Sequence, residues 1–178
     1  MTEYSDEKAL ETVLCDRIAG KSAELGQIPI RKSNTEFHSL AALIGDREFT
    51  VLQDRSEWNQ HKNLLVDISG GMTPDIVIRS NATNQNRIII EVKNTAPLGY
   101  GRVDSQVIRY FLHLLGTTLQ DASKTDIRRA LILAAPDCWF DVARNRDDWQ
   151  YFLDTYKDIA RAFDITLGEI RLPLPHST

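Results

Sequence analysis

Two carboxylates and an amine, Asp75, Glu91 and Lys93, stand at the ends of apolar runs in the middle of the chain. Carboxylate oxygens are hard ligands that suit Mg²⁺ or Mn²⁺, and these ions keep several waters that a phosphate can replace. An ammonium group beside them can hold a metal-bound water, assist its deprotonation and stabilise charge that grows on a phosphorus centre. These residue types indicate metal-assisted attack of water on a phosphate ester, provided that the fold brings them together.

A β-hairpin is the element that would bring Asp75, Glu91 and Lys93 together. Residues 75–79 and 87–93 are rich in β-branched side chains, which favour strands. The link between them, residues 80–86, has the sequence Ser-Asn-Ala-Thr-Asn-Gln-Asn and is typical of a turn. We therefore predict two antiparallel strands joined by this link.

The register of the hairpin decides whether the carboxylates meet. With the turn centred in the link, residues whose numbers sum to 166 face each other, so Asp75 would pair with Glu91 and Arg79 with Arg87. Opposed carboxylates about 5 Å apart destabilise a sheet unless a positive charge lies between them, which favours a bound cation. The two-residue period of a strand places Lys93 on the face of Glu91, whereas a slip of one residue would send Glu91 to the other face.

The remaining elements follow from periodicity and from Gly and Pro positions. We expect the order α, then βββ, then αβα, in a single domain over residues 1–178 with residues 27–72 as an uncertain insertion or elaboration. The proline-rich tail, residues 171–178, is expected to fray. The expected helices are 6–25, a short one near 37–44, 103–119 and one around 149–163, and the further expected strands are 49–52 and 129–135.

At these residues the sequence resembles the PD-(D/E)XK nuclease superfamily. The motif is present as Pro74-Asp75, fifteen intervening residues, and Glu91-Val92-Lys93. The resemblance covers residues 73–135 well and the N-terminal third by element order alone. It implies an α/β, restriction-endonuclease-like fold with an αβββαβ core, in which helices flank a mixed central sheet.

The resemblance also assigns roles to residues. It implies that Asp75, Glu91 and the backbone carbonyl of Val92 hold Mg²⁺ or Mn²⁺, and that Lys93 serves the attacking water. Members of the family often add a glutamate from the first helix. Three residues are open for that role, namely Glu7, Glu11 and, if the first core helix is the one near residue 40, Glu36.

Further candidates for substrate contact follow the lysine strand. Gln106 and Tyr110 lie four residues apart on one helix face, a spacing similar to that of the exonuclease-like branch of the family, where the pair lines the site. Arg102 and Arg109 would suit phosphate contacts. The other basic residues near the proposed site in sequence would suit the same contacts, namely Arg79, Arg87, Lys124, Arg128 and Arg129.

The favoured hypothesis is a Mg²⁺-dependent nuclease that hydrolyses phosphodiester bonds of DNA by attack of a metal-activated water, as an endonuclease rather than an exonuclease. It could act as a homodimer or with a recognition partner. The alternative is a catalytically inactive module of the same fold that binds nucleic acid or a protein partner. A site without catalytic function would not need a repulsive carboxylate pair, and the presence of Asp75 and Glu91 counts against the alternative.

Composition limits the possible partners and the cellular location of the protein. The net charge of −4 argues against a protein whose whole surface coats a polyanion. No apolar run approaches the ~20 residues that a bilayer span requires, and the N-terminus is polar, so we expect a cytoplasmic protein with no membrane partner. The two cysteines, Cys15 and Cys138, lack the spacing of a zinc pair, and a disulfide framework is not expected.

Overall fold

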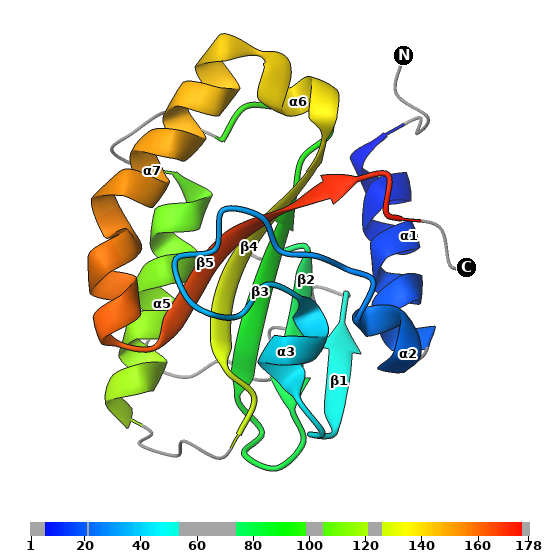
Figure 1. The fold of residues 1–178 in the computed structure, drawn as a ribbon, viewed down its shortest axis with the longest axis vertical. Helices are drawn as coiled ribbons and strands as arrows, with labels where there is room; N and C mark the ends of the chain where they lie inside the picture. Colours follow the sequence, from blue (N-terminus) through cyan, green and yellow to red (C-terminus); the bar gives the residue numbers. More distant parts are fainter. Residues whose placement is uncertain (1–5, 21, 54–73, 99–104, 121–125, 176–178) are drawn as a thin grey trace.

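A computed structural model describes residues 6–20, 22–53, 74–98, 105–120 and 126–175 (Figure 1). Its strands are β1 (Phe49–Leu52), β2 (Ile76–Ser80), β3 (Asn86–Val92), β4 (Arg129–Pro136) and β5 (Ile165–Leu172). Its helices are α1 (Glu7–Gly20), α2 (Ser22–Leu25), α3 (Leu40–Ile44), α5 (Gln106–Gln120), α6 (Asp137–Asp141) and α7 (Ala143–Ala162).

The strands form one five-stranded mixed sheet in the order β1-β2-β3-β4-β5. The first three strands are antiparallel neighbours, whereas β3, β4 and β5 run parallel. Helix α5 connects β3 to β4, and helices α6 and α7 connect β4 to β5. The chain is thus an α/β protein with an open mixed sheet flanked by helices, as expected from the pattern of strands and helices.

The hairpin has the predicted register over most of its length. Ile76, Val77 and Ile78 pair with partners whose numbers complete the sum of 166. The register shifts after Ile78, so that Arg79 pairs with Asn86. The predicted pairing of Arg79 with Arg87 is therefore wrong, because an irregularity near the turn places one extra residue on β3.

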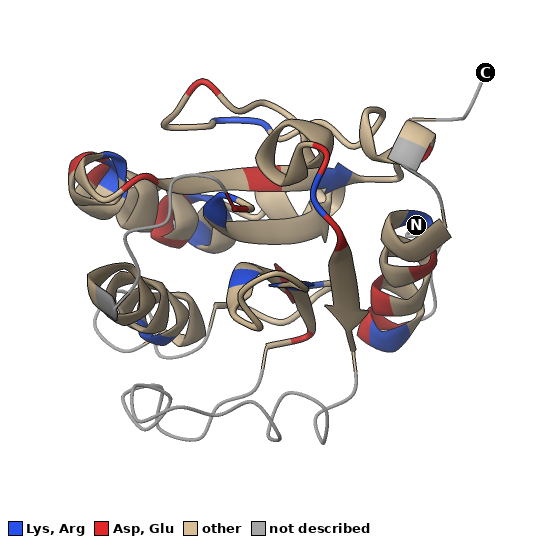
Figure 2. Ribbon diagram, turned by 90° about the horizontal axis from the view of Figure 1, so that it is seen from below, with Lys and Arg blue, Asp and Glu red and all other residues tan. Residues whose placement is uncertain are grey.

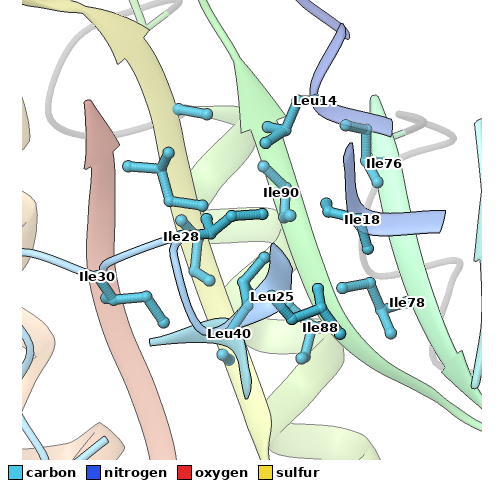
Figure 3. Close-up of a cluster of buried hydrophobic side chains, with 14 of the residues drawn as sticks. Leu14, Ile18, Leu25, Ile28, Ile30, Leu40, Ile76, Ile78, Ile88 and Ile90 are labelled. Carbon is cyan, nitrogen blue, oxygen red and sulfur yellow. The ribbon is translucent and has the colours of Figure 1, made fainter. Parts of the chain in front are cut away.

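Each face of the sheet buries its own apolar core. Alternation along β3 sends Ile88, Ile90 and Val92 to one face and Ile89 to the other. On the first face α1, α2 and α3 cover the isoleucines, and on the second α5, α6 and α7 do so (Figure 1). The first core, shown in Figure 3, includes Leu14, Ile18, Leu25, Ile28, Ile30, Leu40, Ile76, Ile78, Ile88 and Ile90.

The segment before β1 belongs to the domain core. Ile28 and Ile30 are buried, and Arg31 exchanges two backbone hydrogen bonds with Glu169 of β5, at 2.8 and 2.9 Å. Gly168 permits this close approach, because a Cβ there would meet Ile30 Cγ2 at 2.3 Å. The part of this segment up to residue 53 therefore packs as part of the domain, and residues 54–73 lie outside the described residues.

Several boundaries differ from the sequence-based expectation. The first helix ends at Gly20 and a short second helix follows, where one helix over 6–25 was expected. The last helix begins at Ala143, earlier than expected, and α6 precedes it. Strand β5 was not expected at all.

The C-terminal tail is packed rather than frayed up to Pro175. Leu172 ends β5, and both Leu172 and Leu174 are buried in the first core. The Arg17 side chain of α1 donates a hydrogen bond to the Pro175 carbonyl at 2.6 Å. The tail was misjudged because its prolines exclude a helix without excluding extended chain that packs against α1.

The buried tail makes Leu174 a testable contributor to stability. Replacing Leu174, which is 8% exposed, with alanine is expected to lower the free energy of unfolding by about 2 kcal/mol, because a buried leucine side chain is lost. Leu119→Ala is the control, since Leu119 is 78% exposed and its truncation should change little. Urea unfolding measures both, and equal midpoints for the two variants would contradict the packed tail.

Two surface helices carry charge of both signs. Acidic and basic residues are interspersed along α1 and α7 (Figure 2). Within the described residues, no helix combines the length and apolar character needed to span a bilayer.

Candidate active site

The three central residues converge where β3 ends and β2 begins. Continuing the hairpin register by one residue from the Ile76–Ile90 pair sets Asp75 opposite Glu91. Asp75 Oδ2 accepts a hydrogen bond from the Val92 backbone N–H at 2.7 Å. The Lys93 ammonium lies 3.0 Å from Glu91 Oε1. The structure thus brings Asp75, Glu91 and Lys93 into one cluster, on the edge of the sheet formed by the carboxyl ends of the parallel strands.

Burial and mutual repulsion strain the two carboxylates. Glu91 is 2% exposed, and its burial together with the negative charge of Asp75 raises the pKa of Glu91 to about 8. Burial likewise raises the pKa of Asp75, although the hydrogen bond from Val92 opposes the change. Near neutral pH the pair therefore favours an added positive charge, which a proton or a cation can provide.

Lys93 remains a cation in this setting. Burial alone would lower its pKa, but the negative charges of Glu91, Glu7 and Asp75 outweigh burial and raise the pKa of Lys93. A lysine with a raised pKa is charged at neutral pH and cannot accept a proton. Lys93 is thus suited to donate hydrogen bonds and positive charge, rather than to deprotonate a water.

The donor set can be compared with the needs of a divalent ion. In the described ranges, no three His, Cys, Asp or Glu side chains are grouped so as to hold a metal by themselves. Mg²⁺ often uses only one or two carboxylates and completes its shell with water. No donor among the described residues reaches the buried Glu91 Oε2, which leaves that oxygen to a cation or to a proton shared with Asp75.

The Val92 carbonyl completes this set. Val92 N–H points toward the β2 side, and the carbonyl of a strand residue points to the same side as its N–H. The hairpin register places Pro74 opposite Val92, and proline has no N–H to donate. Asp75, Glu91 and the Val92 carbonyl therefore fit a Mg²⁺ or Mn²⁺ ion.

Two glutamates of α1 approach the same carboxylates. Glu7 Oε2 accepts a hydrogen bond from the Asn94 backbone N–H at 3.2 Å. The negative charge of Glu7 contributes to raising the pKa values of Asp75, Glu91 and Lys93. Glu11 is 8% exposed, and its burial and the charge of Asp75 raise its pKa. Because the two lie one helical turn apart, α1 brings both toward the cluster of Asp75, Glu91 and Lys93.

Glu36 is the one predicted glutamate that the fold separates from the site. It is exposed in the loop that precedes α3. Asn34 of this loop bonds the backbone at the start of β5, including the Ile165 carbonyl. Residue 165 aligns with the start of β4, whereas Glu91 lies near the opposite end of the parallel strands. Glu36 therefore does not join the cluster.

Helix α5 places its first residue at the lysine. Gln106 Oε1 accepts a hydrogen bond from Lys93 Nζ at 3.1 Å. Tyr110, one turn later, is fully buried, and its burial and the charges of Glu91 and Asp75 raise its pKa. Arg109 lies half-buried on the same helix. Arg102 lies outside the described residues.

Two of the basic residues suggested for phosphate contact have structural roles instead. Arg87 is fully buried and pairs with Asp126 at 2.9 Å. Although burial opposes it, hydrogen bonds from Ser80 and Thr83 lower the pKa of Asp126, which keeps this pair ionised. Arg129 is buried and donates hydrogen bonds to the Thr117 side chain and carbonyl. These arginines tie the turn end of the hairpin and the start of β4 to the fold.

Other residues that support the site escaped the sequence analysis. The segment after Lys93 is anchored by Asn94, whose backbone bonds Glu7, and by Ala96, whose carbonyl accepts from Trp139 Nε1 at 2.8 Å. No local pattern reveals the Ala96 contact, because it joins residues 43 positions apart.

Comparison of the chain with known protein families, curated proteins and solved structures gives no match. The arrangement of the described side chains is therefore the basis of the functional proposal.

Proposed function

We propose that the protein is a metal-dependent nuclease that hydrolyses phosphodiester bonds, with DNA as the favoured substrate. The fold we propose is the restriction-endonuclease-like variant of the observed mixed α/β sheet, with a PD-(D/E)XK site. The observation that supports this most directly is the meeting of Asp75, Glu91 and Lys93, with Glu91 Oε2 buried and lacking a donor among the described residues.

The division of roles follows from the charges. Asp75, Glu91 and the Val92 carbonyl would hold Mg²⁺ or Mn²⁺, which when bound activates water and offsets the negative charge of a phosphate. Lys93 donates positive charge and hydrogen bonds to the developing phosphorane oxygens. Glu7 or Glu11 would orient waters on the Asp75 side.

The alternative, a non-catalytic module of the same fold, is disfavoured by the electrostatic cost of the site. A buried carboxylate pair with raised pKa values destabilises a protein that does not use it. Such strain is typical of functional sites. We propose that the enzyme is an endonuclease that acts as a homodimer or with a recognition partner.

Cleavage of circular DNA tests the function. Wild-type protein is expected to cut circular single-stranded or supercoiled double-stranded DNA in Mg²⁺ or Mn²⁺ and to be inactive in chelator. Asp75→Asn should abolish cleavage because it removes a ligand charge, whereas Asp158→Asn, an exposed aspartate of α7, should cleave like wild type. Gel electrophoresis reads the product, and circles without ends report endonucleolytic action.

Two outcomes would overturn the proposal. One is wild-type protein that leaves circular and linear DNA and RNA intact and gains no thermal stability from either metal. The other is cleavage that Asp75→Asn retains. Metal-induced stabilisation without cleavage of any of these substrates would favour the non-catalytic module.

A further inference from the structure

The ammonium of Lys93 has hydrogen-bond partners on two different elements. An ammonium group has three donors, and Lys93 gives one to Glu91 Oε1 at 3.0 Å and one to Gln106 Oε1 at 3.1 Å. Glu91 lies on the same strand, whereas Gln106 begins α5. Among the described residues no third partner reaches the ammonium, so one donor of Lys93 is left for the site.

These two partners are not equivalent. Glu91 is also a proposed metal ligand, so its carboxylate has to satisfy the ion as well as the lysine. Gln106 is neutral, and its Oε1 adds an acceptor without adding a further negative charge to the cluster. A lysine side chain has four rotatable methylene links, and a second anchor restricts where its ammonium points.

We propose that Gln106 is a positioning residue for Lys93, which fixes the ammonium so that its remaining donor faces the scissile phosphate. The inference rests on the proposed nuclease function. The backbone supports it, because Ser105 is buried and its side chain accepts a hydrogen bond from the Ile108 N–H at 3.4 Å, which holds the first turn of α5. Gln106 is therefore held on the end of a fifteen-residue helix rather than on a loop.

Substitutions of Gln106 separate positioning from packing. Gln106→Met keeps the length but loses the carbonyl acceptor, and it is expected to lower kcat about tenfold with KM changed less than threefold. Gln106→Glu keeps an acceptor at the same place, and because the nearby carboxylates favour its neutral, protonated form, it should recover most of kcat. Gln150→Met is the matched control, since Gln150 also accepts from a lysine, Lys32 Nζ at 3.1 Å, on the exposed surface.

A double-mutant cycle shows whether Gln106 acts through the lysine. In a Lys93→Met background, Gln106→Met should lower kcat no further, because the group that it positions is already absent. Equal fold-losses in the two backgrounds would overturn the proposal. So would a Gln106→Met variant within twofold of wild type, or a Gln106→Glu variant as impaired as Gln106→Met.

A second readout needs neither metal nor turnover. In ¹⁵N-lysine NMR of the metal-free protein, the Lys93 ammonium should give an ordered signal, identified by its loss in Lys93→Met. Its order parameter should fall in Gln106→Met and stay high in Gln106→Glu and Gln150→Met. An unchanged order parameter in Gln106→Met overturns the positioning role, whereas inactive wild-type protein with an ordered Lys93 overturns the nuclease function alone.

Discussion

Lys93→Met is expected to reduce metal-dependent cleavage by about 10²–10⁴-fold while it leaves metal-induced stabilisation in place. The reason is that Lys93 donates charge and hydrogen bonds and supplies no metal ligand. Its side chain is only 8% exposed, and its ammonium is held by Glu91 and Gln106, so the charge is fixed before substrate arrives. Single-turnover cleavage at saturating protein measures the loss, and thermal melting with and without Mg²⁺ measures the retained binding.

Lys157→Met provides the comparison. Lys157 lies on α7 with a side chain 48% exposed and is paired only loosely, 3.8 Å from Asp154. Surface ion pairs of this kind contribute little to the free energy of unfolding, so the Lys157→Met protein should stay folded and cleave like wild type. If both lysine variants cleave like wild type, Lys93 has no part in the chemistry.

Glu91→Gln is expected to have opposite effects on stability without and with metal. The folded-state pKa of Glu91 is about 8, against a reference of 4.5, so the folded protein binds more protons than the unfolded chain between these values. The free energy of unfolding of metal-free wild type should therefore fall as pH rises from about 5 to 8. Glutamine at 91 cannot ionise, so in chelator at pH 8 the variant should be the more stable protein, by roughly 2 kcal/mol.

Addition of Mg²⁺ should reverse this order. Wild type gains about 2.7 kcal/mol when Mg²⁺ is present at one hundred times its dissociation constant, whereas Glu91→Gln, lacking a ligand charge, should gain none. Denaturant unfolding at pH 5 and pH 8, with chelator or Mg²⁺, gives the four values for each protein. A variant whose stability depends on pH as steeply as that of wild type would show that Glu91 is not the titrating group.

The hairpin and most of its register were predictable because their signals are local. The β-branched runs and the polar link fixed both strands, and the sum rule gave the pairing of Ile76 with Ile90. From there the juxtaposition of Asp75 with Glu91 follows. The shift beside Arg79 was not predictable, because the turn residues do not specify which strand carries the extra residue.

Strand β5 escaped prediction because its stabilising contacts are distant in sequence. Glu169 interrupts its apolar pattern and resembles a surface residue, yet it is 1% exposed and accepts a hydrogen bond from Trp149 Nε1 at 2.8 Å. Arg171 also bonds Glu169 and lies over the Phe140 ring, 3.8 Å from its centroid. A buried charged residue becomes recognisable only when the fold supplies its partners.

The choice among the first-helix glutamates shows the same limit. Sequence placed Glu7 and Glu11 on one helix face without relating that face to the strands. The contact between Glu7 and the Asn94 backbone depends on how α1 packs against the sheet. Helix packing of this kind arises from the whole apolar core and cannot be read from a single segment.

The location of a divalent ion tests the central claim most directly. Crystals grown or soaked with Mn²⁺ would reveal the ion by anomalous scattering. The account predicts a peak between the carboxylates of Asp75 and Glu91, beside the Val92 carbonyl, which disappears in crystals of Asp75→Asn. Well-ordered Asp75 and Glu91 side chains with no peak between them at saturating Mn²⁺ would contradict it.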